Sequence, residues 1–308
     1  MNKLKKIFRL LTDENYRFNV LANYGFFNHW PDEKFLKRKF KAVFGYELNL
    51  DNPQTFNEKL QWLKLYDRKP IYTTMVDKYE AKKYVASIIG EQYIIPTLGV
   101  WDSPDEIDFD KLPNQFVLKC NHNSGLGMCI CKDKSKLDIE KVKRELAKGL
   151  KQDYYLTNRE WPYKDVPRKI IAEKYMEDTQ QQELRDYKFF CFNGRVDNVM
   201  VCVDRLKGEP KFYFFNEKWE LLRLNKRGKA APADFTLEKP PHINKMFDLA
   251  SVLSKKISFA RVDFYNCNQQ IYFGEMTFFP QSGLDVNLLR ETDIYLGNLL
   301  MLPCLQER

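Results

Sequence analysis

The stretch RVDFYNCNQQIYFGEMTFFPQSG, residues 261–283, has two short apolar runs on either side of a polar turn at residues 266–270. Side chains alternate between the two faces of a strand, so this pattern predicts a β-hairpin. Each run carries one carboxylate, Asp263 and Glu275. If the turn centres near residues 268–270, antiparallel pairing places these acids roughly opposite each other. Like charges opposite each other destabilise a sheet, so a positive charge is expected between them.

Two sources of this positive charge are open. Arg261 would form a salt-bridged patch on a solvated face, whereas a divalent cation with oxygen ligands would make the hairpin a metal site. The alternation assigns Val262 and Phe264 to the opposite face of the first strand. It places these side chains on the faces that carry the acids: Arg261, Asp263 and Tyr265 on the first strand, and Phe273, Glu275 and Thr277 on the second.

The composition is that of a globular protein. With 308 residues, of which 44% are hydrophobic and 30% charged, the chain can form two compact subdomains. We find no apolar stretch of the roughly 18 residues that a membrane-spanning helix needs, and no secretory signal. The seven cysteines are odd in number and mostly stand singly in apolar runs, which favours buried thiols in a reducing cytoplasm.

The positive charge is concentrated near the N-terminus. The net charge is +8, and the first 50 residues hold ten Lys and Arg against five Asp and Glu. The start MNKLKKIFRLL predicts a basic amphipathic helix with Leu4, Ile7, Phe8 and Leu11 on one side. Such a helix either lies on an anionic membrane surface or packs on its own domain. No nucleic-acid-binding motif accompanies the charge, so no nucleic-acid partner is expected.

The remaining pattern indicates an α+β protein with antiparallel hairpins and scattered helices. Thr55 or Asn57 would cap the second helix, Asp77 would start the third and Gly90 would end it. An Asn-Gly turn at residues 193–194 predicts a hairpin. Helices are expected at 32–45, 55–67, 76–90, 138–152 and 242–257, and strands within 93–102, 115–133, 168–176, 186–204, 211–222 and 261–277.

Three further segments carry polar groups beside strands. In FVLKCNHNSGLG, Lys119 ends a strand and residues 121–127 form a small-residue loop that suits a phosphate, although an ordinary hairpin turn looks similar. In IIAEKYM, Glu173 ends a strand whose edge could pair with an adenine, and the alternative is an ordinary charged strand end. In DYKFFCFNG, Asp186 and Lys188 share a face, where they could bind ribose and phosphate or form a cross-strand ion pair.

The order of these segments resembles the ATP-grasp superfamily, and more narrowly the teichuronopeptide-biosynthesis (TupA-like) ATP-grasp family. The resemblance spans about residues 56–300. It is carried by FNEKLQWLK, DKYEAKKYV, IPTLGVWD, LPNQFVLKCNHNSG, IIAEKYMED, DYKFFCFNG, FARVDFYN and YFGEMTFFPQSG.

The resemblance implies an ATP-grasp fold that binds ATP and Mg²⁺. Lys78 and Lys119 match the lysines that hold the phosphates. Asp186 falls near the ribose-binding acid, with Lys188 beside it. Arg261 matches the arginine that stabilises the charge on the transferred phosphoryl group. Thr277 departs from the asparagine that many ATP-grasp enzymes carry as a further magnesium ligand, although a hydroxyl can still coordinate. The other implied positions are Asn123, Ser124, Gly125 and Gly127 in the phosphate loop, Glu173, Lys174, Tyr175 and Met176 in the adenine hinge, and Asp263 and Glu275 as magnesium carboxylates.

The resemblance also implies a division of the chain and a reaction. We expect a helical region at 1–70, a first subdomain with the phosphate loop at 71–178, and a second with the magnesium site at 179–308. The expected reaction joins a carboxylate to an amine through an acylphosphate. The carboxylate would belong to a uronic-acid sugar of a glycan or sugar nucleotide, and the amine to an amino acid or small amine. The reaction would serve capsule or cell-surface polysaccharide synthesis. Arg290 and His122 are candidate substrate contacts.

Three other functions remain open at this stage. A kinase on the same scaffold would need a general base, for which only Asp186 and His122 are visible. A metal-dependent glycosyltransferase would usually need an Asp-x-Asp pair, which is not found at a strand end. A nucleotide-binding scaffold protein would not need the lysines and acids. The oligomeric state is not predicted.

Overall fold

The computed structural model describes residues 3–178, 184–205 and 208–304, and the chain forms two compact units. Unit 1 comprises Met1–Arg68, Tyr155–Trp161 and Phe278–Arg308, and unit 2 comprises Lys69–Tyr154 and Pro162–Thr277. The predicted boundaries after residues 70 and 178 stay predictions. Residues 179–183, which directly follow the second predicted boundary, lie outside the described residues.

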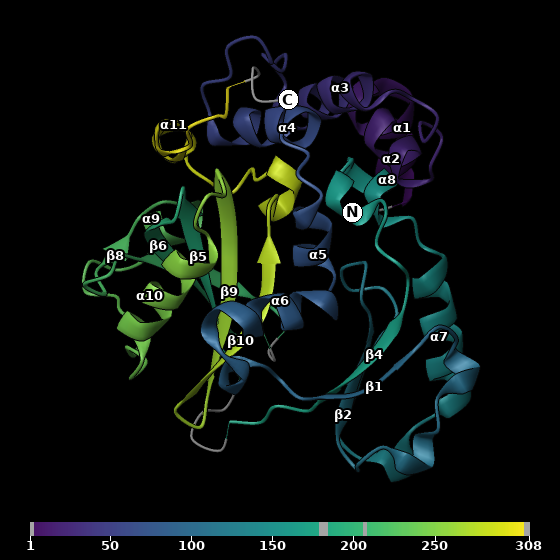
Figure 1. Ribbon diagram of the computed structural model, residues 1–308. Coiled ribbons are helices and arrows are strands. Elements are labelled where there is room, and N and C mark those ends of the chain that lie inside the picture. The colour runs from purple at the N-terminus through teal and green to yellow at the C-terminus, as the bar shows by residue number, and fades with distance from the viewer. Residues whose placement is uncertain (1–2, 179–183, 206–207, 305–308) are drawn as a thin grey trace. The chain divides into compact units, whose positions relative to one another are not determined.

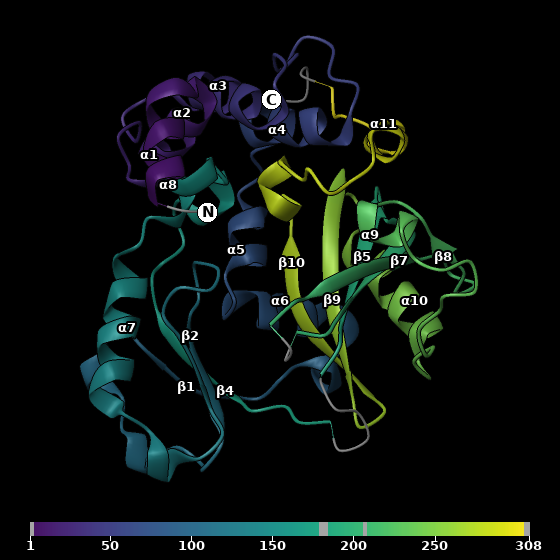
Figure 2. The ribbon, with the colours of Figure 1, turned by 180° about the vertical axis from the view of Figure 1, so that it is seen from behind.

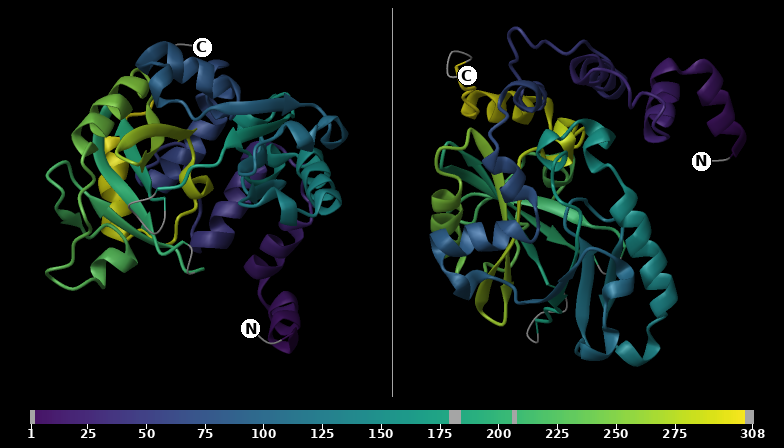
Figure 3. Two further views of the ribbon diagram at one scale, coloured as in Figure 1. Left: turned by 90° about the horizontal axis from the view of Figure 1, so that it is seen from below. Right: turned by 45° about the vertical axis from the view of Figure 1, so that its right-hand side comes forward.

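Unit 2 contains a small antiparallel sheet in the order β1-β4-β2-β3. Its strands are β1 (Thr97–Trp101), β2 (Phe116–Cys120), β3 (Met128–Cys131) and β4 (Ile170–Lys174). The helix α7 (Ile139–Lys151) lies along this sheet in Figure 1 and in the right-hand view of Figure 3. Val142 and Leu146, four residues apart on one helical face, join the buried core under the sheet.

The second sheet of unit 2 has the order β10-β9-β5-β6-β7-β8, with every paired strand antiparallel. Asn193 and Gly194 connect β5 to β6, and both have positive φ, as a tight hairpin turn requires. This confirms the predicted hairpin. The strands are β5 (Asp186–Phe192), β6 (Arg195–Val203), β7 (Lys211–Phe215), β8 (Leu221–Leu222), β9 (Phe259–Cys267) and β10 (Gln270–Thr277).

Helices cover the apolar face of this large sheet, as the view from behind in Figure 2 shows. α10 (Ile243–Leu253) packs on β5, β6 and β9, while α5 (Ile71–Val76) and α6 (Glu80–Ile89) pack on β10. The ring of Phe189 on β5 meets that of Phe247 on α10 edge to face at 5.0 Å. Val262 and Phe264 of β9 are buried on this face, as predicted. The polar side chains of β9 therefore belong to the opposite face.

A β-bulge at Gly274 corrects one prediction about the hairpin. Asp263 pairs directly with Glu275, as expected, but the register shifts between Phe273 and Glu275, and Phe273 pairs with buried Phe264. The extra residue of a bulge changes which side chains share a face. The prediction that Phe273 shares a face with Glu275 is therefore wrong, and Phe273 belongs to the apolar core.

Unit 1 contains most of the remaining helices. Thr55 caps α4 (Phe56–Tyr66). In a capping box, the Thr55 side chain accepts from the backbone N–H of Glu58, and the Glu58 side chain accepts from the backbone N–H of Thr55. None of the described helices combines the length and the apolar character that crossing a membrane requires. The remaining α-helices are α1 (Lys3–Thr12), α2 (Glu14–Asn23), α3 (Asp32–Phe44), α4 (Phe56–Tyr66), α8 (Tyr154–Asn158) and α11 (Arg290–Leu299) in unit 1 and at its boundary, and α9 (Lys226–Lys229) in unit 2. Short 3-10 helices lie at Glu91–Tyr93, Pro104–Glu106, Phe109–Lys111, Lys134–Lys136, Trp161–Tyr163 and Pro280–Gly283.

Candidate functional site

The polar face of the large sheet holds a cluster built on Asp263, which we call the large-sheet cluster: Lys188, Arg261, Asp263, Glu275 and Thr277. The strand register sets it, because Asp263 pairs with Lys188 on β5 and with Glu275 on β10. Arg261 donates Nε to Asp263 Oδ1 and Nη2 to Oδ2, both at 2.7 Å. Nη2 also lies 2.9 Å from Glu275 Oε1 and 3.1 Å from Thr277 Oγ1, and Lys188 Nζ lies 2.5 Å from Asp263 Oδ2.

The members of the large-sheet cluster differ in how far they are exposed to solvent. Asp263 is 2% exposed and Arg261 is 9% exposed, so the salt bridge that was expected on a solvated face is a buried one. The side chain of Glu275 keeps 41% of its surface exposed. Burial alone would raise the pKa of Glu275, but the charges of Arg261, Lys188, Lys78 and Lys119 lower it to about 2. Glu275 therefore carries a negative charge at neutral pH.

The small sheet holds a second cluster, the small-sheet cluster of Lys82, Lys119 and Glu173. Glu173 is 5% exposed, and its two oxygens lie 2.7 Å from Lys82 Nζ and 2.5 Å from Lys119 Nζ. Lys82 also donates to Ile95 O and Thr97 Oγ1, both at 2.9 Å. Burial would raise the pKa of Glu173, but the two lysines bring it below its ordinary value. Glu173 thus holds Lys119 in place as an anion.

Lys78 lies in the short turn between α5 and α6. Asp77 accepts from the backbone N–H groups of Tyr79 and Glu80 and so caps the start of α6, close to the predicted place. Lys78 Nζ lies 2.5 Å from Asn123 O. Burial lowers the pKa of Lys78, and the charge of Glu275 partly offsets this. Lys78 therefore lies in the same electrostatic environment as the large-sheet cluster.

The loop at residues 121–127 is anchored at both ends. Asn121, His122 and Asn123 are buried, while Ser124 and Gly125 are exposed. His122 Nε2 lies 3.1 Å from Gln152 O, and burial lowers the pKa of its imidazole. His122 thus packs within the base of the loop.

At the other end, Gly127 has a positive φ and lies against Gly149 of α7. An added Cβ at Gly127 would come within 2.9 Å of Gly149 Cα and of Cys120 Sγ, so this close approach requires glycine. The loop tip between the two anchors, at residues 124–126, is exposed.

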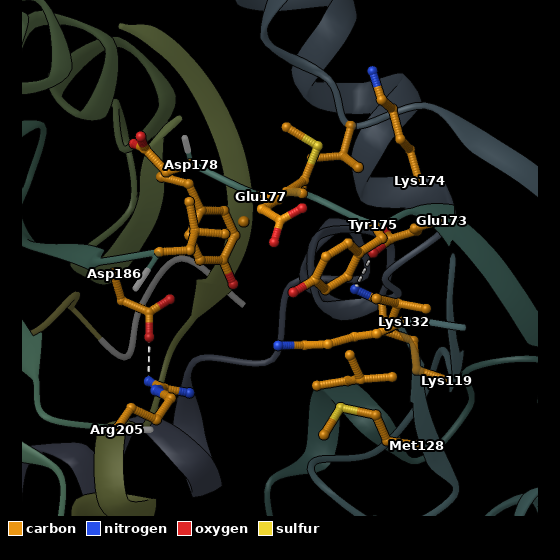
Figure 4. Close-up of a pocket in the computed structure, with 17 residues that line it drawn as sticks. Lys119, Met128, Lys132, Glu173, Lys174, Tyr175, Glu177, Asp178, Asp186 and Arg205 are labelled. Carbon is orange, nitrogen blue, oxygen red and sulfur yellow. Dashed lines mark hydrogen bonds and ion pairs between the residues drawn. The ribbon is translucent and has the colours of Figure 1, made fainter. Parts of the chain in front are cut away.

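A cavity of 420 Å³ adjoins Lys119 and Glu173, and Figure 4 shows the side chains that line it. Asp186 lines it and forms an ion pair with Arg205. The amine of Lys132 lies 5.8 Å from the ring centre of Tyr175. The whole lining is Ile95, Val117, Lys119, Met128, Ile130, Lys132, Glu173, Lys174, Tyr175, Met176, Glu177, Asp178, Leu184, Asp186, Arg205, Tyr265 and Gly274. All four predicted hinge residues lie on this cavity.

The structure therefore brings most of the predicted site residues together in unit 2. Arg290 is different, because it lies in unit 1 at the start of α11, where its Nη1 is 3.2 Å from the hydroxyl of Tyr46. Sequence reasoning missed Lys82 and Arg205. A lysine at a buried position of α6 between Ala81 and Val85 was a usable signal for Lys82, whereas nothing local marked Arg205.

The oxygen donors fit a magnesium ion that is shared with a nucleotide. Among the described residues, no group of three His, Cys, Asp or Glu side chains could hold a metal by itself. Mg²⁺ is usually held by one or two carboxylates together with substrate phosphates, rather than by an all-protein cage. The two carboxylates and one hydroxyl of the large-sheet cluster, with Glu275 exposed, match such a partial ligand set.

Solved structures of ligases are similar to this chain. The D-alanine–D-alanine ligase from Bacillus anthracis, complexed with ATP, has 17% identity and a TM-score of 0.42 over 73% of this chain and 60% of the ligase. The enzyme from Helicobacter pylori has 16% identity and a TM-score of 0.42 over 80% of this chain and 69% of that one. D-cycloserine synthetase DcsG has 14% identity and a TM-score of 0.42 over 75% of this chain and 71% of that one.

Comparison of sequences assigns the family. No curated protein matches the chain. The TupA-like ATPgrasp family matches residues 58–301, which is most of the sequence. Together with the two sheets and the helical N-terminal region, this match confirms the predicted fold class and the prediction of an ATP-grasp enzyme. The protein belongs to the TupA-like ATP-grasp family.

Proposed function

We propose that this protein is an ATP- and magnesium-dependent ligase that joins a carboxylate to an amine through an acylphosphate. One observation carries the proposal. Arg261 Nη2 lies 2.9 Å from a carboxylate oxygen of Glu275, whose side chain is partly exposed, and the charges of Arg261, Lys188, Lys78 and Lys119 lower the pKa of this carboxylate. Such a mixture of positive charge and carboxylate oxygen suits a triphosphate with its metal ion.

The cavity beside these charges is the proposed nucleotide pocket. Its volume of 420 Å³ lies in the usual range for small-molecule sites, about 300–1,000 Å³. Apolar side chains such as Met128 and Ile130 give it a face for a base. We assign the adenine to the hinge at residues 173–176 and the ribose to Asp186, whose carboxylate Arg205 orients.

The phosphates would lie between the two clusters. Lys78 and Lys119 would bind them as point charges, with the loop at residues 123–127 above them. Arg261 would hold the carboxylates of Asp263 and Glu275 and balance charge on the γ-phosphate. Magnesium held by Asp263, Glu275 and Thr277 would act as a Lewis acid and a template for the phosphates.

The proposed chemistry needs no nucleophile from the protein. An oxygen of the substrate carboxylate bonds to the γ-phosphorus while the bond from that phosphorus to the β–γ bridging oxygen breaks, and ADP leaves. The amine nitrogen then bonds to the carbonyl carbon, the carbon–oxygen bond to phosphate breaks, and the nitrogen loses a proton. The chain's own residues orient the reactants and neutralise charge.

The substrate class is the finer part of the proposal. We propose a uronic-acid sugar of a capsule or cell-surface glycan, or its sugar nucleotide, as the carboxylate and an amino acid or small amine as the partner, in the cytoplasm. Arg290 is exposed and is our candidate for binding the carboxylate. The subdomain boundaries after residues 70 and 178 are proposed with it.

Phosphorus NMR tests the proposal. The purified protein is mixed with ATP, Mg²⁺, a pool of uronic-acid sugars and sugar nucleotides, and a pool of amino acids and small amines. We expect ADP and free phosphate only when both pools are present. A new phosphomonoester signal without any amine would instead indicate a sugar kinase. The matched control is Glu217→Gln, an exposed acid on the loop after β7, which should react like the wild type.

A further inference from the structure

The first helix carries an exposed apolar face. Ile7 is 56% exposed, Phe8 is 66% exposed and Leu11 is 72% exposed. Their spacing places them on one side of α1, and we call these three residues the α1 face. The side chain of Leu4, predicted for the same side, lies outside the described part of the chain. Large apolar side chains that gather on an exposed face usually mark an interaction surface.

The C-terminal end of α1 is attached to α2, so the α1 face is not exposed merely because the helix is detached. Arg17 of α2 donates Nη1 to Leu11 O at 3.1 Å and to Leu10 O at 3.3 Å. Arg9 pairs with Asp13 at 3.0 Å, and its guanidinium lies 4.4 Å from the ring centre of Tyr16. Arg9 lies on the side of α1 away from the α1 face, so its contacts leave Ile7, Phe8 and Leu11 exposed.

The positive charge of α1 indicates that its partner surface is anionic. The helix sequence KLKKIFRLLT has three lysines and one arginine and no acid. Lys5 and Lys6 are exposed. Lys5 lies at the edge of the α1 face next to Phe8, whereas Lys6 lies on the polar side of the helix near Arg9. An apolar strip on a helix whose polar side carries lysines complements a surface that is apolar inside and anionic outside, because lysine stems lie along apolar groups while their amines reach the charges.

We propose that α1 docks on an anionic phospholipid surface, with Ile7, Phe8 and Leu11 inserted at the headgroup–acyl boundary and Lys5 and Lys6 at the lipid phosphates. One short helix with few charges gives weak, reversible attachment. Each lysine near an anionic membrane contributes about 1 kcal/mol, which is about fivefold in affinity. The proposal does not rest on the ligase reaction, and its test needs no turnover.

Vesicle flotation with the full chain tests this inference. We expect binding to phosphatidylcholine vesicles that contain about one third phosphatidylserine, and much weaker binding to pure phosphatidylcholine. Lys5→Gln with Lys6→Gln should weaken binding by about fivefold for each lysine, and added salt should weaken it further. Phe8→Asp with Leu11→Asp should abolish binding. Unfolding curves that match the wild type would show that the variants are folded.

Val252→Glu provides the matched control, since Val252 is 43% exposed on the helix α10 and its replacement should leave binding unchanged. Two results would overturn the proposal. One is equal binding to neutral and anionic vesicles, or binding to neither. The other is a mass of two chains by light scattering that falls to one chain in the Phe8→Asp and Leu11→Asp variant, because the α1 face would then contact a second copy.

Discussion

Two buried carboxylates in unit 2, Glu173 and Asp263, are held by cations in opposite ways. In the small-sheet cluster, one acid meets two lysines. The partner nearer to solvent is a cation, since the side chain of Lys119 is 21% exposed against 7% for the side chain of Glu173. In the large-sheet cluster, two acids meet Arg261 and Lys188. The partner nearer to solvent is an acid, since the side chain of Glu275 is 41% exposed against 10% for the side chain of Arg261.

The contrast shows how similar buried ion pairs can leave side chains of opposite charge at the surface, suited to ligands of opposite charge. The excess of cation around Glu173 leaves the partly exposed side chain of Lys119, which we propose as a phosphate contact. The balanced cluster around Asp263 leaves the partly exposed side chain of Glu275, which we propose as a ligand for magnesium. The choice of cation supports this division, because the planar fork of Arg261 can hold two carboxylates at once whereas a lysine is a compact point charge.

The strongest test of the contrast removes Asp263. Asp263→Asn leaves Arg261 and Lys188 buried without their shared anion, and breaking a buried ion pair from one side costs about 3–5 kcal/mol. We expect a loss of that size in the free energy of unfolding, measured with denaturant, together with loss of ATP turnover. Glu217→Gln, in the exposed loop, should lose neither. An unchanged unfolding curve for Asp263→Asn would contradict the buried cluster.

A pair of milder substitutions tests the opposite ligands. Lys119→Gln should raise the KM for ATP by about tenfold or more, because a charged hydrogen bond to phosphate is lost. Glu275→Gln should lower kcat by about a hundredfold or more and raise the Mg²⁺ concentration needed, because several kcal/mol of metal stabilisation are lost. Steady-state kinetics at varied ATP and Mg²⁺ separate the two effects. If both substitutions changed only the KM for ATP, the contrast would fail.

The smallest expected effect is on acid stability. The pKa of Glu275 falls from an ordinary 4.5 to about 2 in the folded chain. A lowered pKa adds stability that is present above the unfolded value, so this contribution should disappear as the pH falls from 4.5 toward 2. Denaturant unfolding over this range should show a shallower loss in Glu275→Gln than in the wild type. Equal slopes would mean that the cations do not act on Glu275.

Local sequence signals predicted much of the fold. The cap at Thr55, the turn at residues 193–194 and the pairing of Asp263 with Glu275 depend on neighbouring residues and on strand alternation, and each is confirmed. The family resemblance assigned the candidate site residues, and their roles stay predictions. The burial of the Arg261–Asp263 salt bridge was not predicted, because it depends on side chains from distant segments, such as Lys188 on β5, and no single motif contains them.

Ion pairs between residues far apart in the sequence could not be predicted from local patterns. Lys82 meets Glu173, and Arg205 meets Asp186, only because the sheets bring distant segments together. The bulge at Gly274 was also not visible, because strict alternation through YFGEMT looks regular. A glycine in a strand was the available hint, since an added Cβ there would lie 3.1 Å from the ring of Tyr265 and 3.2 Å from Asp263 O.

That single extra residue makes β10 a strand of two phases. Before Gly274, odd-numbered Phe273 belongs to the core, and after it, odd-numbered Glu275 belongs to the polar face. Insertions and deletions of one residue are usually disruptive within strands because they invert every side chain beyond them. Here the inversion places Phe273, an aromatic residue of the core, two positions from Glu275, the proposed magnesium ligand. The bulge thus joins a stretch of β10 whose odd-numbered side chains pack in the core to a stretch whose odd-numbered side chains lie on the polar face, without a loop between them.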